Sequence, residues 1–146
     1  MAIMEEAFCT YLLTKAAITA IIGTGSAARL WPAELPQSYS VSQGSAAVYE
    51  IISTDEQHTL SDRSGFVQSR VQIATYAATH KAAMTLAREI KNCGITTLKG
   101  LSSSVDFRSV QVESGIRCYA EQPTDGTDSR RYIAEFDFMI SYLEGT

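Results

Sequence analysis

The sequence predicts a single α+β domain, spanning residues 1–146, in which an antiparallel β-sheet of four to five strands carries two α-helices on one face. Its 146 residues fit the roughly 100–200 residues of one domain. The patterns follow the order helix, two strands, helix, then two or three strands. The segment 130–144 alternates apolar and polar side chains, which is typical of a strand with one face on a core. Hairpin-compatible connections and this one-sided alternation favour a sheet covered by helices on one side.

The composition excludes several classes of protein. With 45% hydrophobic and 19% charged residues, the chain is typical of a globular domain. The net charge is −4 and the basic residues are scattered, so we expect no specific binding to a nucleic-acid backbone. No apolar run approaches the ~20 residues of a membrane span, and the start MAIMEEAF lacks the basic flank of a signal peptide. We therefore expect a protein that is neither exported nor bound to a membrane.

Residues 4–22 are expected to form the first helix. Their apolar side chains recur at helical spacing. Glu5 and Glu6 lie in the first turn, where carboxylates are favoured by the helix dipole. Gly23 and Gly25 are expected to end the helix.

The next segment, RLWPAELPQ at residues 29–37, predicts a stiff connector. Pro32 and Pro36 hold the residues before them in extended geometry. One hypothesis is that the connector fixes the path from the first helix to the sheet. The alternative is that Trp31 packs over a sheet edge and the prolines only restrict the unfolded chain.

Two strands and a second helix follow. Residues 46–53 are β-branched and aromatic and predict a central strand, and 65–77 resume the alternation of a strand. Between them, the polar segment 54–65 is expected to be a long loop. The second helix is expected to begin after Thr79 as its N-cap and to stop at Gly94.

The rest of the chain is predicted to be β-structure. Residues 101–121 form one or two strands with a bulge at Gly115, and 121–129 form a polar turn. The closing strand is the clearest in the chain, because its core-facing positions are Tyr132, Ala134, Phe136, Phe138, Ile140 and Tyr142.

Motifs for metal or nucleophilic chemistry are weak. His58 and His80 have no partner at zinc-ligand spacing. Cys93 or Cys118 could pair with a histidine, but nothing nearby in the sequence activates either thiol. The glycine-rich stretch 23–28 follows a helix, whereas a phosphate-binding loop follows a strand and opens a helix. We expect no cofactor, no metal and no enzymatic activity.

The acidic residues also fit solvent exposure better than chemistry. Asp55, Glu56 and Asp62 lack the regular ligand spacing of a calcium site. Glu135 and Asp137 lie two apart on the polar face of the closing strand, where we expect an edge that faces solvent or a partner.

Four segments in order carry a resemblance to a known family. They are RLWPAELPQ, AAVYEIIS, RVQIATYAATHKAAMTLAREI and RRYIAEFDFMISY. Together they resemble the tail completion, or tail terminator, proteins of long-tailed bacteriophages and related prophages, over nearly the whole chain. That family often has a proline just before its AVVY-like strand, where this chain has Ser45 and Ala46.

The resemblance implies a structural protein of the virion neck, assembled in the cytoplasm of the host bacterium. Family members form a homohexameric ring that caps the tail tube and then joins it to the head-to-tail connector or stopper protein. DNA passes through the ring without specific binding. A ring built head to tail needs two different complementary patches on each subunit. The polar segments 54–65 and 121–130 supply them, with contact residues Asp55, Glu56, His58, Asp62, Arg63, Asp125, Asp128 and Arg130.

Two alternatives remain open from the sequence. A head-side connector or adaptor of the same neck would contact the portal side and not the tube, and composition does not distinguish it from a tail terminator. A small α+β ligand-binding or enzymatic domain, including a dimeric one, would instead need a concave pocket with converging polar groups.

Overall fold

The computed structural model describes residues 4–40, 43–58, 63–97, 100–102, 105–121 and 130–143. Side chains are described in these ranges except at 26, 57–58, 63–66, 95–97 and 100–102.

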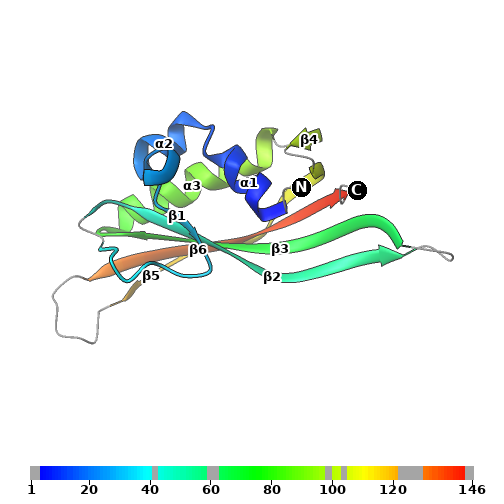
Figure 1. Cartoon of the computed structure of the whole chain (residues 1–146). Coiled ribbons are helices and arrows are strands. Elements are labelled where there is room, and N and C mark those ends of the chain that lie inside the picture. The colour runs from blue at the N-terminus through cyan, green and yellow to red at the C-terminus, as the bar shows by residue number, and fades with distance from the viewer. Residues whose placement is uncertain are drawn as a thin grey trace.

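A six-stranded sheet forms one layer and three helices form the other (Figure 1). The strand order is β1-β2-β3-β6-β5-β4, and every neighbouring pair is antiparallel except β1 with β2. The strands are β1 Leu30–Pro32, β2 Ala46–His58, β3 Arg63–Ala77, β4 Gly100–Ser102, β5 Val105–Glu121 and β6 Arg131–Leu143. The helices are α1 Met4–Leu12, α2 Ala16–Ile22 and α3 His80–Thr97. All three lie on the same face of the sheet, so the predicted α+β class is confirmed, with more strands and one more helix than expected.

The predicted opening helix is divided into α1 and α2. Thr14 directs its hydroxyl to the carbonyl of Tyr11 at 2.6 Å, which offers the backbone an alternative to the helical ladder. Lys15 then takes an extended conformation and α2 begins after it. The predicted stop at Gly23 is confirmed: its φ is 93°, and its N–H donates to the carbonyl of Thr19.

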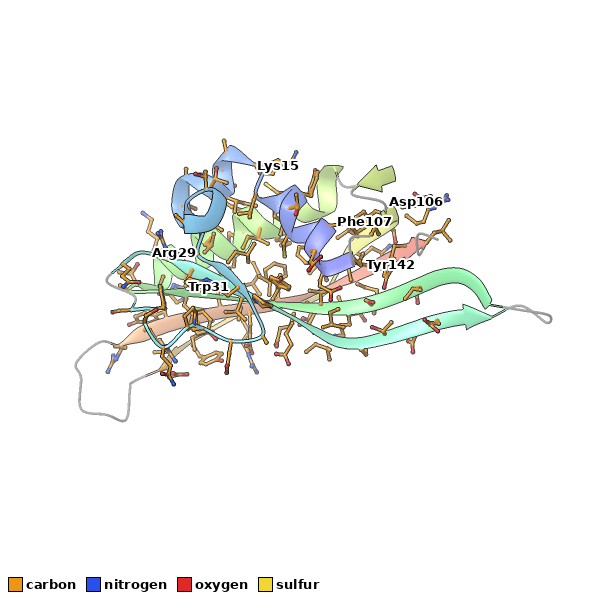
Figure 2. All side chains as sticks on the ribbon, in the orientation of Figure 1. Lys15, Arg29, Trp31, Asp106, Phe107 and Tyr142 are labelled. Atoms are coloured by element: carbon orange, nitrogen blue, oxygen red, sulfur yellow. The ribbon has the colours of Figure 1, made fainter. Side chains whose placement is uncertain are left out.

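The proline-rich connector contributes a strand of its own. It forms β1, whose Trp31 is in register with Val48 of β2. Arg29, just before β1, donates to the carbonyl of Ser45 at 2.8 Å and to that of Ile21 at 2.7 Å. The guanidinium therefore joins the end of α2 to the start of β2 (Figure 2). Arg29 therefore helps to fix the path from helix to sheet, and the same role for the prolines stays a prediction.

The core lies between the helices and the sheet. Phe8 of α1 meets Phe138 of β6 edge-on, with ring centroids 5.3 Å apart, and Phe136 lies 4.9 Å from Phe138. Phe107 of β5 extends the cluster, 6.5 Å from Phe8. The predicted core face of the closing strand is confirmed, because its fully buried members are Ala134, Phe136, Phe138 and Ile140.

Helix α3 begins as predicted and ends later than predicted. Thr79 caps it, since its hydroxyl accepts a hydrogen bond from the amide of Ala82 at 3.1 Å. The expected stop at Gly94 is wrong, because the helix continues to Thr97. A Cβ atom at Gly94 would lie only 2.6 Å from Cζ of Phe138. The glycine is therefore needed for close packing of helix on sheet, and it does not terminate the helix.

Replacing Gly94 with alanine is expected to reduce the free energy of unfolding by about 1–3 kcal/mol through overpacking against Phe138. The better helix propensity of alanine offsets up to ~1 kcal/mol of that loss. Chemical denaturation measures the difference. In a Phe138→Leu background the same substitution should cost less, and an equal cost in both backgrounds would contradict the proposed contact.

The predicted loop at 54–65 is wrong over most of its length. β2 continues to His58 and β3 starts at Arg63, with Thr54 paired to Ser69 and their hydroxyl oxygens 3.2 Å apart. The side chains here are polar because this part of β2 lies at the outer edge of the sheet, where residues 53–56 are exposed. Polarity in this segment marks an exposed strand edge.

The bulge expected at Gly115 is confirmed. The register between β5 and β6 shifts between Ser114 and Arg117, so that β5 has one extra residue opposite β6 there. Most of the turn expected at 121–129 lies outside the described residues.

Candidate functional site

The first group of predicted contact residues lies on the hairpin of β2 and β3. Asp55 and Glu56 are exposed on β2. His58 and Arg63 are the last and first residues of the two strands and are in register with each other. Asp62 lies outside the described residues. The hairpin places these positions at one end of the sheet (Figure 1).

Of the second predicted group, the structure describes only Arg130, which lies at the opposite end of the sheet. Arg130 is exposed and immediately precedes β6, at the end of the sheet where β5 finishes at Glu121. Asp125 and Asp128 lie outside the described residues. The structure therefore does not bring the two groups into one cluster. A protein that used both would contact its partners at two separate places.

The face of the sheet opposite the helices, here called the open face, carries charged groups that are bonded to one another. Arg70 of β3 donates through Nε to Oδ2 of Asp137 on β6 at 2.7 Å. The amide of Asp137 also donates to the hydroxyl of Ser114 at 3.3 Å. Asp137 is only 9% exposed, because β6 is an interior strand. The expectation that Glu135 and Asp137 lie on an edge is wrong.

A second ion pair crosses from β5 to β6. The guanidinium of Arg117 contacts the carboxylate of Glu135 and lies over the ring of Tyr119, 5.5 Å from its centroid. The hydroxyl of Tyr119 reaches the same carboxylate at 3.5 Å. Cross-strand pairs of this kind stabilise a sheet by roughly 0.2–1 kcal/mol each. They account for both acidic residues of the closing strand without a catalytic role.

The sequence interpretation missed these ion pairs, although it contained a signal for them. On β6 the charged residues Arg131, Glu135 and Asp137 all lie at odd-numbered positions, which places them on one face of the strand. To predict the ion pairs one must also know which residues of neighbouring strands lie opposite each other. The three register shifts in β5 cannot be located from alternation alone.

The connector from residue 33 to 40 lies against the open face and borders a pocket of ≈ 390 Å³. Tyr39 meets Trp31 edge-on at 5.5 Å and donates its hydroxyl to the carbonyl of Gly44 at 2.6 Å. On the sheet side, Arg131 lies over the ring of Tyr76, 5.3 Å from its centroid. Trp31 is half-buried, in agreement with the hypothesis that it packs over the sheet edge (Figure 2).

A second hollow, of ≈ 260 Å³, opens at the β5 bulge on the open face. Arg117, Glu135 and Asp137 line it, with Gln72 and Gly115. Each of its three charged groups is already bonded to a protein partner. The charges that line the hollow are therefore neutralised within the protein. The ion pairs suit a role in holding β3, β5 and β6 in register.

The cysteines are not activated as nucleophiles. Burial raises the pKa of the Cys9 thiol to about 12. Burial likewise raises the pKa values of Cys93 and Cys118. All three thiols are thus protonated near neutral pH, whereas the thiolate is the reactive form.

Within the described ranges, no group of three or more His, Cys, Asp or Glu side chains is arranged to hold a metal ion. His80 is exposed at the start of α3, with its ring 6.3 Å from that of Tyr132. Among the helices that the structure describes, none has the length and apolar character needed to cross a bilayer.

Comparison with known proteins identifies the fold. No family model and no curated protein matches the chain. Among solved structures, the chain is similar to a chain of the structure described as "Virion of native gene transfer agent (GTA) particle". The alignment covers 95% of this chain and 94% of the other, with a TM-score of 0.56 and 16% sequence identity. At this identity the likeness establishes a shared fold over almost the full length of both chains.

Proposed function

We propose that this chain is a structural protein of a phage-like virion, which forms a ring that caps the tail tube and joins it to the head-side connector. The observation that carries the proposal is the fold shared, end to end, with a chain of a gene transfer agent virion. The resemblance of four sequence segments to tail completion proteins narrows the role to the neck of the particle.

The chemistry of the surface supports assembly. Three arginines of the sheet are bound to carboxylates within the same subunit: Arg70, Arg117 and Arg131. The three thiols are protonated at neutral pH. The exposed predicted contact residues lie at opposite ends of the sheet. Two separate contact regions fit a subunit that meets a tail tube on one side and a connector on the other.

The same proposal assigns the protein a place and a set of neighbours. It is assembled in the host cytoplasm and resides at the top of the tail, in contact with other copies of itself, the tail tube protein and the connector or stopper protein. DNA crosses the ring without specific binding. An acidic subunit with a net charge of −4 disfavours adhesion of the phosphate backbone to the channel wall.

Electron microscopy and native mass measurement test the ring directly. Purified protein, alone and mixed with tail tubes, should yield six-fold rings, with rings seated on one end of each tube. Co-purification with capsids in the absence of tubes would favour the head-side connector instead. A subunit that stays single on tubes and on capsids would contradict the proposal.

The contact residues on the first hairpin give a second test. The Asp55→Asn, Glu56→Gln double variant should slow tube capping or head joining several-fold, and the defect should shrink at high salt, because exposed charges mainly steer association. Rates are measured by counting joined particles over time. Arg130→Gln is the matched variant at the other end of the sheet and should impair the other contact. Normal rates for both variants would contradict the assignment.

A further inference from the structure

The sheet has an outer edge on each side that its own strands cover only in part. On one side, β1 pairs with residues 47–49 of β2. On the other, β4 pairs with residues 105–107 of β5. Among the described residues, no strand pairs with the outer edge of β2 from 50 to 58 or of β5 from 108 to 121. An uncovered edge presents unpaired N–H and C=O groups to any strand that approaches.

Two backbone hydrogen bonds show which residues of β2 turn their backbone groups outward. The amide of Ala47 donates to the carbonyl of Arg29 at 2.9 Å, and the carbonyl of Tyr49 accepts from the amide of Ala33 at 2.8 Å. In an antiparallel pair, alternate residues bond the partner strand and the rest face away from it. The odd-numbered residues of this part of β2 therefore face away from β3.

The bulge in β2 shifts this alternation by one residue. The register with β3 slips between Ile51 and Ser53, so Ser53 opposes Arg70 and Thr54 opposes Ser69. Beyond the bulge, the outward-facing backbone groups belong to Thr54 and then to Glu56. A proline at position 54 would remove an outward N–H and leave the ladder with β3 in place.

The described residues include two large apolar side chains that are exposed, and each lies on one of these edge strands. Ile52 on β2 is 50% exposed and Tyr119 on β5 is 41% exposed. A head-to-tail contact between identical copies joins two different surfaces. Each of the two edge strands therefore has one exposed apolar side chain to offer to such a contact.

The charges of the two edges also differ. β2 carries Glu50, Asp55 and Glu56 along its exposed length. β5 carries charges of both signs: Arg108 and Arg117, whose side chains are 54% and 73% exposed and which pair with Asp106 and Glu135, and also Glu113 and Glu121. Two β2 edges brought together would oppose carboxylates, which is unfavourable. A β2 edge beside a β5 edge avoids that opposition of carboxylates alone, because β5 carries guanidinium groups as well.

The chain directions suit this arrangement. β2, β3, β6 and β5 are joined by three successive antiparallel pairings, so β2 and β5 run in opposite directions. A copy rotated about an axis along the strands keeps its strand directions, and its β5 would lie antiparallel to β2 of its neighbour. Through Gln68 and Ser141, Asp55 is level with Ser109, the residue next to Arg108.

We propose that the outer edge of β2 in one copy pairs antiparallel with the outer edge of β5 in the next copy, so that the sheets of the ring form one continuous, closed surface. This inference rests on the ring of the proposed function. It adds the pair of strands that makes the subunit–subunit contact, by addition of one strand edge to another.

The Thr54→Pro variant tests the pairing, with Thr54→Ala as the matched control. Both variants lose the hydroxyl contact with Ser69, and only proline loses the outward amide. We expect the protein concentration at which half of the subunits are in rings to rise roughly tenfold or more for proline and little for alanine. Native mass spectrometry measures the ring population, and thermal melting shows that each variant is folded.

Hydrogen exchange provides a measurement on the unmodified chain. The amide of Thr54 should exchange rapidly in single subunits and slowly in rings, because assembly gives it an acceptor. Folded Thr54→Pro that forms rings at the wild-type concentration, or equal exchange at 53–57 in rings and single subunits, would overturn the edge pairing and leave the ring itself intact. Wild-type protein that forms no ring, even on tail tubes, would overturn the proposed function and this inference together.

Discussion

The Phe138→Ala variant is expected to lose about 3–5 kcal/mol of the free energy of unfolding, the largest effect we predict for a single substitution. Phe138 is fully buried on β6, a strand with neighbours on both sides. Its ring is in contact with Phe8 and Phe136, and α3 approaches it at Gly94. Removing it opens a cavity where the sheet, α1 and α3 meet, and rigid strands on either side limit how far that cavity can collapse.

Urea denaturation monitored by circular dichroism gives the loss. Phe138→Leu is the graded control and should cost less than alanine, because it leaves a smaller cavity. Tyr119→Ala is the matched exposed aromatic and should cost far less than Phe138→Ala. A loss below about 1 kcal/mol for Phe138→Ala would contradict the position of this ring at the centre of the core.

The second large effect is expected at Arg29. Arg29→Met keeps much of the aliphatic length and removes both hydrogen bonds to the carbonyls of Ile21 and Ser45. Hydrogen bonds to charged groups contribute about 1.5–3 kcal/mol each, and shared geometry makes the pair less than additive. We expect a total loss of about 2–4 kcal/mol, measured by chemical denaturation, together with faster hydrogen exchange in α2.

Two further variants test whether the two-pronged geometry of the Arg29 guanidinium group is needed in addition to its charge. Arg29→Lys keeps the charge but lacks the planar fork that reaches two carbonyls, so it should recover less than half of the loss. Gly44→Ala should also destabilise, since a Cβ there would lie 2.6 Å from Nη2 of Arg29 and the φ of Gly44 is 123°. Wild-type stability for Arg29→Met would show that the prolines alone fix the connector.

The parts of the fold that the sequence predicts well are those with a local cause. Gly23 ends a helix and Thr79 begins one because backbone freedom and a side-chain cap act within a few residues. The closing strand is predicted because its alternation reports directly on the face that is buried.

The errors have non-local causes. Gly94 has the local properties of a helix stop, but the helix continues because Phe138, far away in the sequence, fills the space beside it. The 54–65 segment is polar like a loop, but cross-strand pairing to β3 makes most of it a strand. β1 was not predicted, because a strand of three residues has too few positions to show alternation.

The candidate contact residues are predicted less completely than the fold. Exposure at Asp55, Glu56 and Arg130 agrees with a contact role, and their recognition of a partner stays a prediction. The ion pair of Arg70 with Asp137 depends on which residues of β3 and β6 are opposite, and only the paired strands fix that register.

The position of β6 has a consequence for how the protein is made. β6 follows β3 and β5 along the chain, yet it lies between them in the sheet. Until the ribosome has released this segment, the inner edges of β3 and β5 have no strand partner, and their backbone N–H and C=O groups are unpaired. Synthesis therefore passes through a stage in which a nascent chain is prone to associate with others. Insertion of β6 between β3 and β5 ends that stage for both strands at once.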